Sequence, residues 1–205
     1  GLQSTSDIEV GDSWIRFNKT FGGSDYDQGY SVQQTNDGGY IIAGNHDNFG
    51  PWLIKTDSQG IEEWNQQLGG NYVQKTDDGG YIIVGGGLIK TDSQGIIEWY
   101  KPFGDGSDKG YSVQQTTDGG YIATGETSSF GNGEDDVYLV KTDSQGNLEW
   151  NKTFGGSSSD CGYSVQQTTD GGFIITGTTG SFGNGSFDVW LIKTDSEGNT
   201  APYGD

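Results

Sequence analysis

The sequence predicts an all-β protein made of four copies of one unit, each containing four short antiparallel strands. Two observations predict this fold class. Residues 110–156 are repeated almost letter for letter by residues 162–198 at an offset of 52 residues, and degenerate copies begin at Gly29 and near Asn71. Within each copy, β-rich runs alternate every few residues with turn-forming segments. The fixed period decides the fold, because each repeat is one supersecondary unit that stacks on its neighbours.

The third copy illustrates the four strands of a unit. YSVQQT, YIATG, DVYLVKTD and LEWNKTFGG are strand-like, while TDGG and DSQGN are turn segments. Asp-Gly steps favour tight turns because they tolerate positive φ angles. Four strands without an intervening helix are typical of one blade of a β-propeller, whereas the rungs of a solenoid are shorter.

The two chain ends predict that the blades close into a ring. The last copy ends after KTDSEGN without a fourth strand, while the segment SWIRFNKTFGG precedes the first copy and shares the letters NKTFGG with residues 151–156. We therefore expect a single four-bladed β-propeller domain over residues 1–205, in which this N-terminal strand closes the last blade and removes its free edge. The expected blades are residues 29–70, 71–104, 110–156 and 162–198, with residues 13–23 as the outer strand of the fourth.

Side chains that recur once per copy are expected to be structural. The fourth-strand aromatics should fill the wedge between neighbouring blades, since large rings at fixed positions suit packing. The third-strand lysines are expected to be solvated, or paired with carboxylates for little net stability. The aspartates of TDGG and TDSQG should hydrogen-bond to their own turns. The aromatics are Phe17, Trp64, Trp99 and Trp150, and the lysines are Lys55, Lys90, Lys141 and Lys193.

Composition and charge narrow the classes of partner. The 205 residues include 29 Asp and Glu but only 10 Lys and Arg, which gives a formal net charge of −19. This charge argues against binding to nucleic acid or to anionic membranes, because both require basic surface. No apolar run approaches the ~20 residues of a membrane-spanning helix. The N-terminal sequence fits a mature secreted chain, so we expect an extracellular or cell-surface location.

Catalysis is the least supported class of function. The chain has one Cys, Cys161, and one His, His46, each expected in a loop and neither repeated. Nucleophilic catalysis requires a base beside the nucleophile. A glycosidase needs only two carboxylates at a suitable separation, but no feature of the sequence selects a pair. We therefore expect no enzymatic activity and no bound cofactor.

The segment LVKTDSQGNLEW, residues 139–150, resembles the third and fourth strands of pyrroloquinoline-quinone-type propeller repeats. The whole unit is more similar to the extracellular β-propeller repeats of large bacterial and archaeal surface proteins, over residues 13–198. This resemblance implies a display or adhesion module. No residues match the cofactor and calcium site of the quinone enzymes, so their activity is not implied.

The expected interaction surface is formed by the second-to-third-strand loops and the blade-to-blade loops. The second-to-third-strand loops are long in blades three and four and nearly absent in blade two. Loops on a rigid scaffold often carry binding, although blade two could have lost length neutrally. Aromatics beside carboxylates suit sugars, although each Phe could instead pin its own loop. The candidate ligand-binding residues are Phe49, Phe130, Asp135, Asp136, Phe182, Phe187 and Asp188.

A weak calcium site is a second hypothesis for this surface. Ca²⁺ takes roughly six to eight oxygen ligands, and DYDQG is half of a calcium-loop pattern. The same aspartates could equally cap the entry to the first strand of each blade. The candidate metal ligands are Asp25, Asp27, Asp108 and Asp160.

The sequence therefore predicts a noncatalytic extracellular propeller that acts in adhesion, recognition or structure through its acidic loops. Its partner would be a surface polymer, a glycan or a protein, and self-association is a further hypothesis. A carbohydrate-binding, lectin-like module is the first alternative function, and a glycoside-active enzyme is the second.

Overall fold

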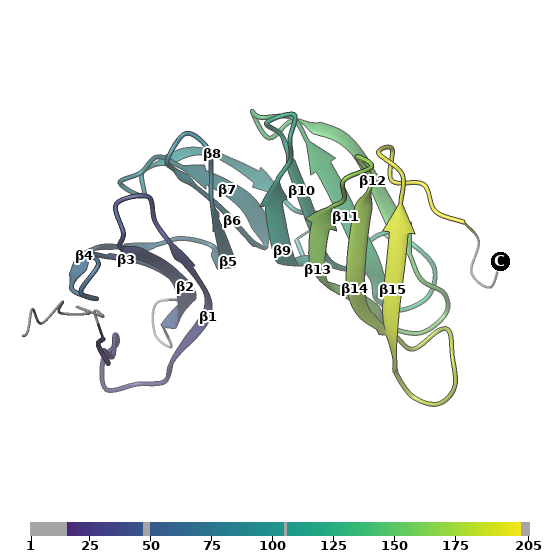
Figure 1. Ribbon diagram of the computed structural model, residues 1–205. Coiled ribbons are helices and arrows are strands. Elements are labelled where there is room, and N and C mark those ends of the chain that lie inside the picture. Colours follow the sequence, from purple (N-terminus) through teal and green to yellow (C-terminus); the bar gives the residue numbers. More distant parts are fainter. Residues whose placement is uncertain (1–15, 47–49, 105, 202–205) are drawn as a thin grey trace, which may run out of the picture.

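The computed structural model describes residues 16–46, 50–104 and 106–201. Over these ranges the chain forms 15 β-strands in four antiparallel sheets and no helix (Figure 1). Each sheet is a meander whose strands are hydrogen-bonded in chain order, and each corresponds to one sequence repeat. Nothing in these ranges forms a helix that is long and apolar enough to cross a membrane.

The sheets contain four, four, four and three strands. The first consists of β1 (Asp27–Gln34), β2 (Tyr40–His46), β3 (Gly50–Thr56) and β4 (Glu62–Gln67). The second consists of β5 (Gly70–Lys75), β6 (Tyr81–Gly85), β7 (Gly87–Thr91) and β8 (Ile97–Pro102). The third consists of β9 (Lys109–Gln115), β10 (Tyr121–Thr127), β11 (Asp136–Thr142) and β12 (Leu148–Phe154). The last consists of β13 (Asp160–Gln167), β14 (Phe173–Thr179) and β15 (Asp188–Thr194).

The turns form as the sequence predicts. In the β9–β10 turn, Asp118 Oδ1 accepts hydrogen bonds from the Thr116 hydroxyl and from the Gly120 backbone N–H. Gly119 in this turn has a φ of 84°, a conformation that glycine adopts without steric cost. In the β11–β12 turn, Asp143 Oδ1 accepts from the backbone N–H groups of two later turn residues. These aspartates therefore act on their own backbone.

The core is divided into three clusters, one between each pair of neighbouring sheets. Between the third and last sheets, for example, Val137 and Leu139 pack with Val165 and Ile175. At each interface, an aromatic side chain of the outer strand packs edge-on or tilted against an aromatic ring of the next sheet. The pairs are Trp64 with Tyr81 (6.0 Å between ring centroids), Trp99 with Tyr121 (5.7 Å) and Trp150 with Phe173 (5.7 Å). The predicted packing role of these aromatics is confirmed for these three pairs.

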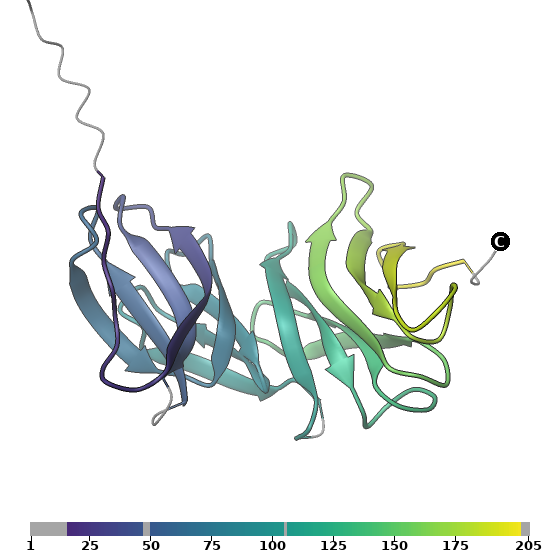
Figure 2. The same ribbon diagram turned by 90° about the horizontal axis from the view of Figure 1, so that it is seen from below.

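The four sheets form an open arc, not a closed ring (Figures 1 and 2). The first sheet lies at one end of the arc and the last sheet at the other. The predicted closure by residues 13–23 is not present: residues 13–15 lie outside the described ranges, and the described part, residues 16–23, lies against the first sheet. Phe17 contacts Tyr40 at 5.6 Å, and β15 has no strand paired to its outer edge among the described residues. The N-terminal segment and β15, its expected partner, therefore lie at opposite ends of the arc.

Candidate functional site

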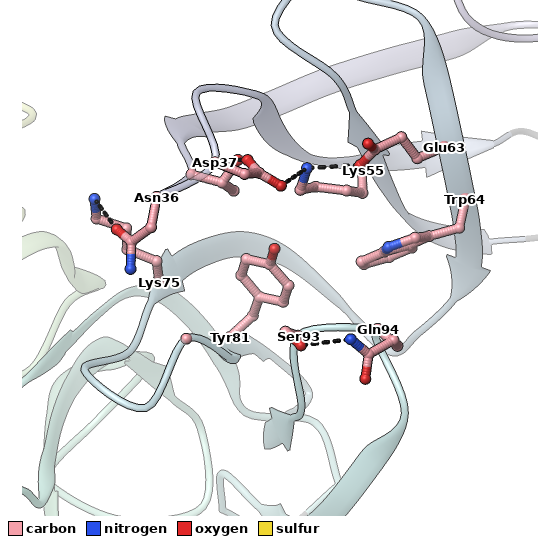
Figure 3. Close-up of a pocket in the computed structure, with 11 residues that line it drawn as sticks. Asn36, Asp37, Lys55, Glu63, Trp64, Lys75, Tyr81, Ser93 and Gln94 are labelled. Carbon is pink, nitrogen blue, oxygen red and sulfur yellow. Dashed lines mark hydrogen bonds and ion pairs between the residues drawn. The ribbon is translucent and has the colours of Figure 1, made fainter.

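The two ends of the strands give the arc two different faces. The turn face carries the β1–β2 and β3–β4 turns and their equivalents, and the loop face carries the longer loops between sheets and between second and third strands. A pocket of about 480 Å³ opens on the turn face between the first and second sheets (Figure 3). Lys55, Trp64 and Tyr81 line it.

A buried lysine on β3 in this pocket links the β1–β2 turn to β4. Lys55 Nζ lies 2.8 Å from Asp37 Oδ2 and 2.7 Å from Glu63 Oε2, and it also donates to the Thr56 carbonyl (Figure 3). The same arrangement recurs around Lys90 and Lys141. Of the two alternatives expected for these lysines, pairing with nearby carboxylates is the one that the structure has, and the three side chains are buried, not solvated. Each of these ammonium groups already has two carboxylate partners, and the arrangement repeats in three of the four sheets. The turn face is therefore best explained by a structural role.

The lysine of the last sheet differs from the other three. Lys193 Nζ has Asp170 at 2.9 Å and the Thr194 carbonyl at 2.8 Å, and its side chain is 43% exposed. The second carboxylate of the other sheets comes from the fourth strand, and no fourth strand is paired to the last sheet among the described residues. Lys193 thus combines the two expected alternatives, because it is partly solvated and is paired with one carboxylate.

The predicted aromatic residues of the loop face lie against their own sheets. The Phe130 ring stacks on Tyr138 with a centroid distance of 5.6 Å, and Phe182 lies tilted against Trp190 at 5.2 Å. These contacts favour the alternative in which each Phe pins its own loop. Phe187 is exposed and is the last residue of the last long loop, directly before β15. Phe49 lies outside the described residues.

The predicted aspartates act mainly on the loops that precede or follow them. Asp136 Oδ2 accepts from the Asn132 N–H at 2.5 Å, and Asp188 Oδ2 accepts from the Asn184 N–H at 2.7 Å. The Asp135 carbonyl accepts from the Asp160 backbone N–H at 2.6 Å. The two long loops are thus fastened at their C-terminal ends by the residue that starts the third strand.

The four candidate metal ligands do not converge. Asp27 and Asp160 lie in different sheets, and each accepts a backbone N–H of the preceding loop, from Gly23 at 2.9 Å and from Gly156 at 3.0 Å. Asp108 Oδ1 accepts from the Ser128 N–H at 3.1 Å, and Asp25 is an exposed residue of the loop before β1. Within the described ranges, no three acidic, His or Cys side chains form a group able to hold a metal ion.

The structure instead brings Asp160 close to Asp136, across the interface between the third and last sheets. A methyl group on Gly155 would lie 1.7 Å from Asp136 Oδ1 and 2.7 Å from Asp160 Oδ2, so both carboxylates crowd this glycine. Both residues are buried, and the Oδ1 atom of each has no hydrogen-bond partner among the described residues. Burial, together with the nearby charges of Asp160 and Asp135, raises the pKa of Asp136.

A row of four tyrosines follows the inner strands on the loop side of the arc. We call Tyr30, Tyr72, Tyr111 and Tyr163 the tyrosine row. Successive ring centroids are 6.3, 6.1 and 5.6 Å apart. The end members, Tyr30 and Tyr163, are 42% and 52% exposed. Tyr30, Tyr111 and Tyr163 share one position in their repeats, two residues before the Val of the strand, whereas Tyr72 lies only one residue before Val73. The row is therefore not an exact repeat in the sequence, where these tyrosines indicated only the first strand of each unit.

Polar groups flank the tyrosine row. Lys109 Nζ lies 2.9 Å from Glu126 Oε1, and the Tyr111 hydroxyl also hydrogen-bonds to Glu126. Burial and this bond raise the pKa of Tyr111. At the other end, Gln28 donates to the Tyr26 hydroxyl at 2.7 Å. Amide, carboxylate and ammonium groups thus surround partly exposed ring surfaces.

The two groups best suited to nucleophilic catalysis are not arranged for it. Cys161 is buried, and burial together with the charge of Glu126 raises the pKa of its thiol to about 12, so that the unreactive thiol form dominates at neutral pH. His46 Nδ1 lies 3.4 Å from Asp27 Oδ1, and its ring meets Trp52 edge-on at 5.3 Å. The two side chains belong to different ends of the arc.

Comparison with known proteins shows a similarity of fold and no family. No protein-family model matches the chain, and no curated protein matches it. Among solved structures, it is similar to one described as "putative exo-beta-1,3-galactanase from Bifidobacterium bifidum s17", with a TM-score of 0.51 and 13% sequence identity. The match covers 87% of this chain and 72% of that chain. At this identity the likeness concerns the fold alone.

Proposed function

We propose that this protein is a noncatalytic, extracellular recognition module that binds a carbohydrate polymer on its loop face. The observation that carries the proposal is the tyrosine row with exposed ends. Sugar rings stack on aromatic faces while neighbouring polar groups take their hydroxyls. Of the surfaces described above, the tyrosine row combines exposed rings with adjacent amide, carboxylate and ammonium groups.

The shape of the loop face supports a polymer as the ligand. The loops between second and third strands span residues 128–135 and 180–187 in the third and last sheets, but in the second sheet β6 and β7 are joined through Gly86 alone. The loops that surround the tyrosine row are therefore shortest at the second sheet. A chain of sugar units could enter there and lie along the row. The −19 net charge favours a neutral or cationic polymer over an anionic one.

Two observations support a noncatalytic function. A glycosidase uses two carboxylates that reach the scissile bond, separated by about 5 to 9.5 Å. The paired carboxylates Asp136 and Asp160 are buried, and a substrate on the loop face would not touch them. Cys161 and His46 lack a catalytic arrangement, as described above. The galactanase that shares the fold makes β-1,3-linked galactans a useful first probe, because its name indicates that substrate.

The test is a glycan array that includes β-1,3-galactans, followed by calorimetry on any glycan that binds. We expect Tyr30→Ala and Tyr163→Ala each to weaken binding by about tenfold or more, since each removes a stacking surface worth at least ~1.4 kcal/mol. Tyr100→Ala is the matched control, because Tyr100 is similarly exposed but lies on β8, away from the row.

The outcomes separate the candidate functions. Binding that survives both row variants would place the site elsewhere, and absence of any glycan ligand would contradict the carbohydrate proposal. Release of reducing sugar from a bound glycan would favour a glycoside-active enzyme instead. Capture of a protein partner without glycan binding would favour protein adhesion.

A further inference from the structure

We propose that a second copy of this chain docks head to tail on the open end of the last sheet. Its first sheet, together with residues 16–23, would recreate there the interface that already occurs three times inside the arc. The docking surface is formed by the outer edge of β15 and by the sheet side that presents Val189 and Leu191.

The apolar side chains at the two ends of the arc match those buried inside it. In the third sheet, Val137 and Leu139 are 1% and 0% exposed because the last sheet covers them. Their equivalents in the last sheet, Val189 and Leu191, are 86% and 67% exposed. At the other end, Val32 is 62% exposed, whereas Val73, Val113 and Val165 in the same strand position are buried. Each end therefore exposes one half of a repeated core.

Hydrogen bonds at the interfaces follow the same repeat. The first Gln of each YSVQQT-type strand accepts a backbone N–H from the next sheet. The three bonds run from Lys75 N to Gln33 Oε1 (2.8 Å), from Gln115 N to Gln74 Oε1 (2.7 Å) and from Gln167 N to Gln114 Oε1 (2.6 Å). By the same rule, Gln166 of the last sheet would accept from Gln34 N of the first. These two residues lie at opposite ends of the arc, so one chain supplies both halves of a fourth bond.

The missing outer strand of the last sheet is also available from a second copy. A groove of about 790 Å³ runs beside β15 and is lined by Trp190, Leu191 and Lys193. Residues 18–23 have the same sequence as residues 151–156, which comprise the end of the third sheet's outer strand, β12, and the two glycines after it. Phe17 already contacts the first sheet as the outer-strand tryptophans contact the following sheets. The N-terminal segment is therefore held on the first sheet as the outer strand of a preceding sheet would be.

One substitution makes this interface weaker than the internal ones. Arg16 stands where the third sheet has Glu149, one residue before the aromatic. Lys193 would therefore keep Asp170 as its carboxylate partner and would lie near a second cation. This difference favours a reversible association that depends on protein concentration.

A second copy fits this surface better than the same chain does. The first and last sheets lie at opposite ends of the arc (Figures 1 and 2), so closure within one chain would require all three internal interfaces to change. Head-to-tail contact leaves these interfaces as they are. Such contacts produce a ring when the rotation closes and a filament when it does not. Two copies that join at both ends would cover the two exposed sheet faces that the described residues leave at the ends of the arc.

The experiment measures mass against concentration by light scattering and by sedimentation. Wild-type chain should pass from one copy to two or more as concentration rises. Leu191→Asp and Val32→Asp should each weaken association by about tenfold or more, because each places a charge in a buried apolar contact. Ile96→Asp is the control, since Ile96 is equally exposed but lies in the β7–β8 turn. Urea unfolding at low concentration should be unchanged in all three variants, because these side chains are exposed in the single chain.

Mixing the two interface variants separates docking from closure within one chain. Leu191→Asp retains an intact first sheet and Val32→Asp retains an intact last sheet, so an equimolar mixture should form a one-to-one complex although neither associates alone. A wild-type chain that stays a single copy at every concentration overturns the proposal. If Leu191→Asp also destabilises that single copy, the face is covered by the chain's own first sheet. These measurements use no glycan, so they stand or fall independently of the proposed carbohydrate binding.

Discussion

The third and last sheets have almost the same sequence but different surroundings. β11 (DVYLVKT) is buried along its whole length, whereas β15 (DVWLIKT) alternates between buried or half-buried and exposed positions. The third sheet has a neighbour on both sides and a fourth strand. The last sheet has a neighbour on one side and three strands. In a repeat protein, burial is therefore set by the neighbouring unit and not by the residue alone.

The comparison also shows what one sheet contributes by itself. Lys141 and Lys193 occupy the same position, but only Lys141 has a Glu on a fourth strand and is buried. The apolar side chains of a third strand form a buried core only when a neighbouring sheet packs against them. Matched substitutions in the two sheets measure how much of the stability belongs to the neighbour.

The largest difference in the free energy of unfolding is expected between alanine variants of the third-strand leucines in these two sheets. Leu139→Ala should lower the free energy of unfolding by about 2–5 kcal/mol, because it opens a cavity in the core between the third and last sheets. Leu191→Ala should change it by less than ~0.5 kcal/mol in the single chain. Urea denaturation at low protein concentration measures both values. Equal losses would show that Leu191 is covered in solution, which contradicts the open arc.

A smaller difference in the free energy of unfolding is expected between methionine variants of the third-strand lysines. Lys141→Met leaves Asp118 and Glu149 without their shared cation, and because both carboxylates are about half exposed we expect a loss of about 1–2 kcal/mol. Lys193→Met removes one exposed ion pair and should cost less than ~0.5 kcal/mol.

The pH dependence provides the check on this second prediction. Burial alone would raise the pKa of Asp118, but hydrogen bonds from Thr116 and Lys141 outweigh it and lower the value to about 2. The stabilisation from this lowered pKa is present above pH 4 and is lost as pH falls toward 2. Wild-type chain and Lys141→Met should therefore converge in stability over that range. A constant difference down to pH 2 would indicate that lost packing, not charge, causes the effect.

The strands and turns were predictable because they depend on local sequence. Asp-Gly turns, alternating strands and the repeat period are all properties of residues within one unit. The structure has one antiparallel sheet for each unit, although the last sheet has three strands among the described residues where four were expected. Ring closure is a property of the angle between units. The sequence at a position such as Val189 is the same whether or not another sheet covers the side chain. The sequence therefore predicted that the last sheet needs a further outer strand, but not where the N-terminal segment would lie.

The candidate site was predictable only in part. The aspartates of the loop face were found from their recurrence before β1, β9 and β13 and before β11 and β15. Their actual partners, such as the Asn132 N–H for Asp136, depend on how each loop folds back. The tyrosine row was missed because ring-to-ring contact between Tyr111 and Tyr163 joins residues from separate repeats. The proximity of Asp136 and Asp160 likewise exists only across an interface.

The smallest expected effect tests that carboxylate pair. Asp136→Asn removes one of two buried like charges while its side-chain oxygen can still accept from the Asn132 N–H, so at pH 7 we expect a gain of up to about 1 kcal/mol. Because the pKa of Asp136 is raised in the folded chain, its charged form costs stability, and this cost grows as pH rises and vanishes at low pH. The gain measured by thermal unfolding should therefore shrink toward pH 4. Asp188→Asn is the matched control, since Asp188 has the same loop contact in the last sheet but no sheet beyond it. A loss of stability in Asp136→Asn, accompanied by a Ca²⁺-dependent rise in the melting temperature of the wild-type chain alone, would instead show that the two carboxylates share a cation.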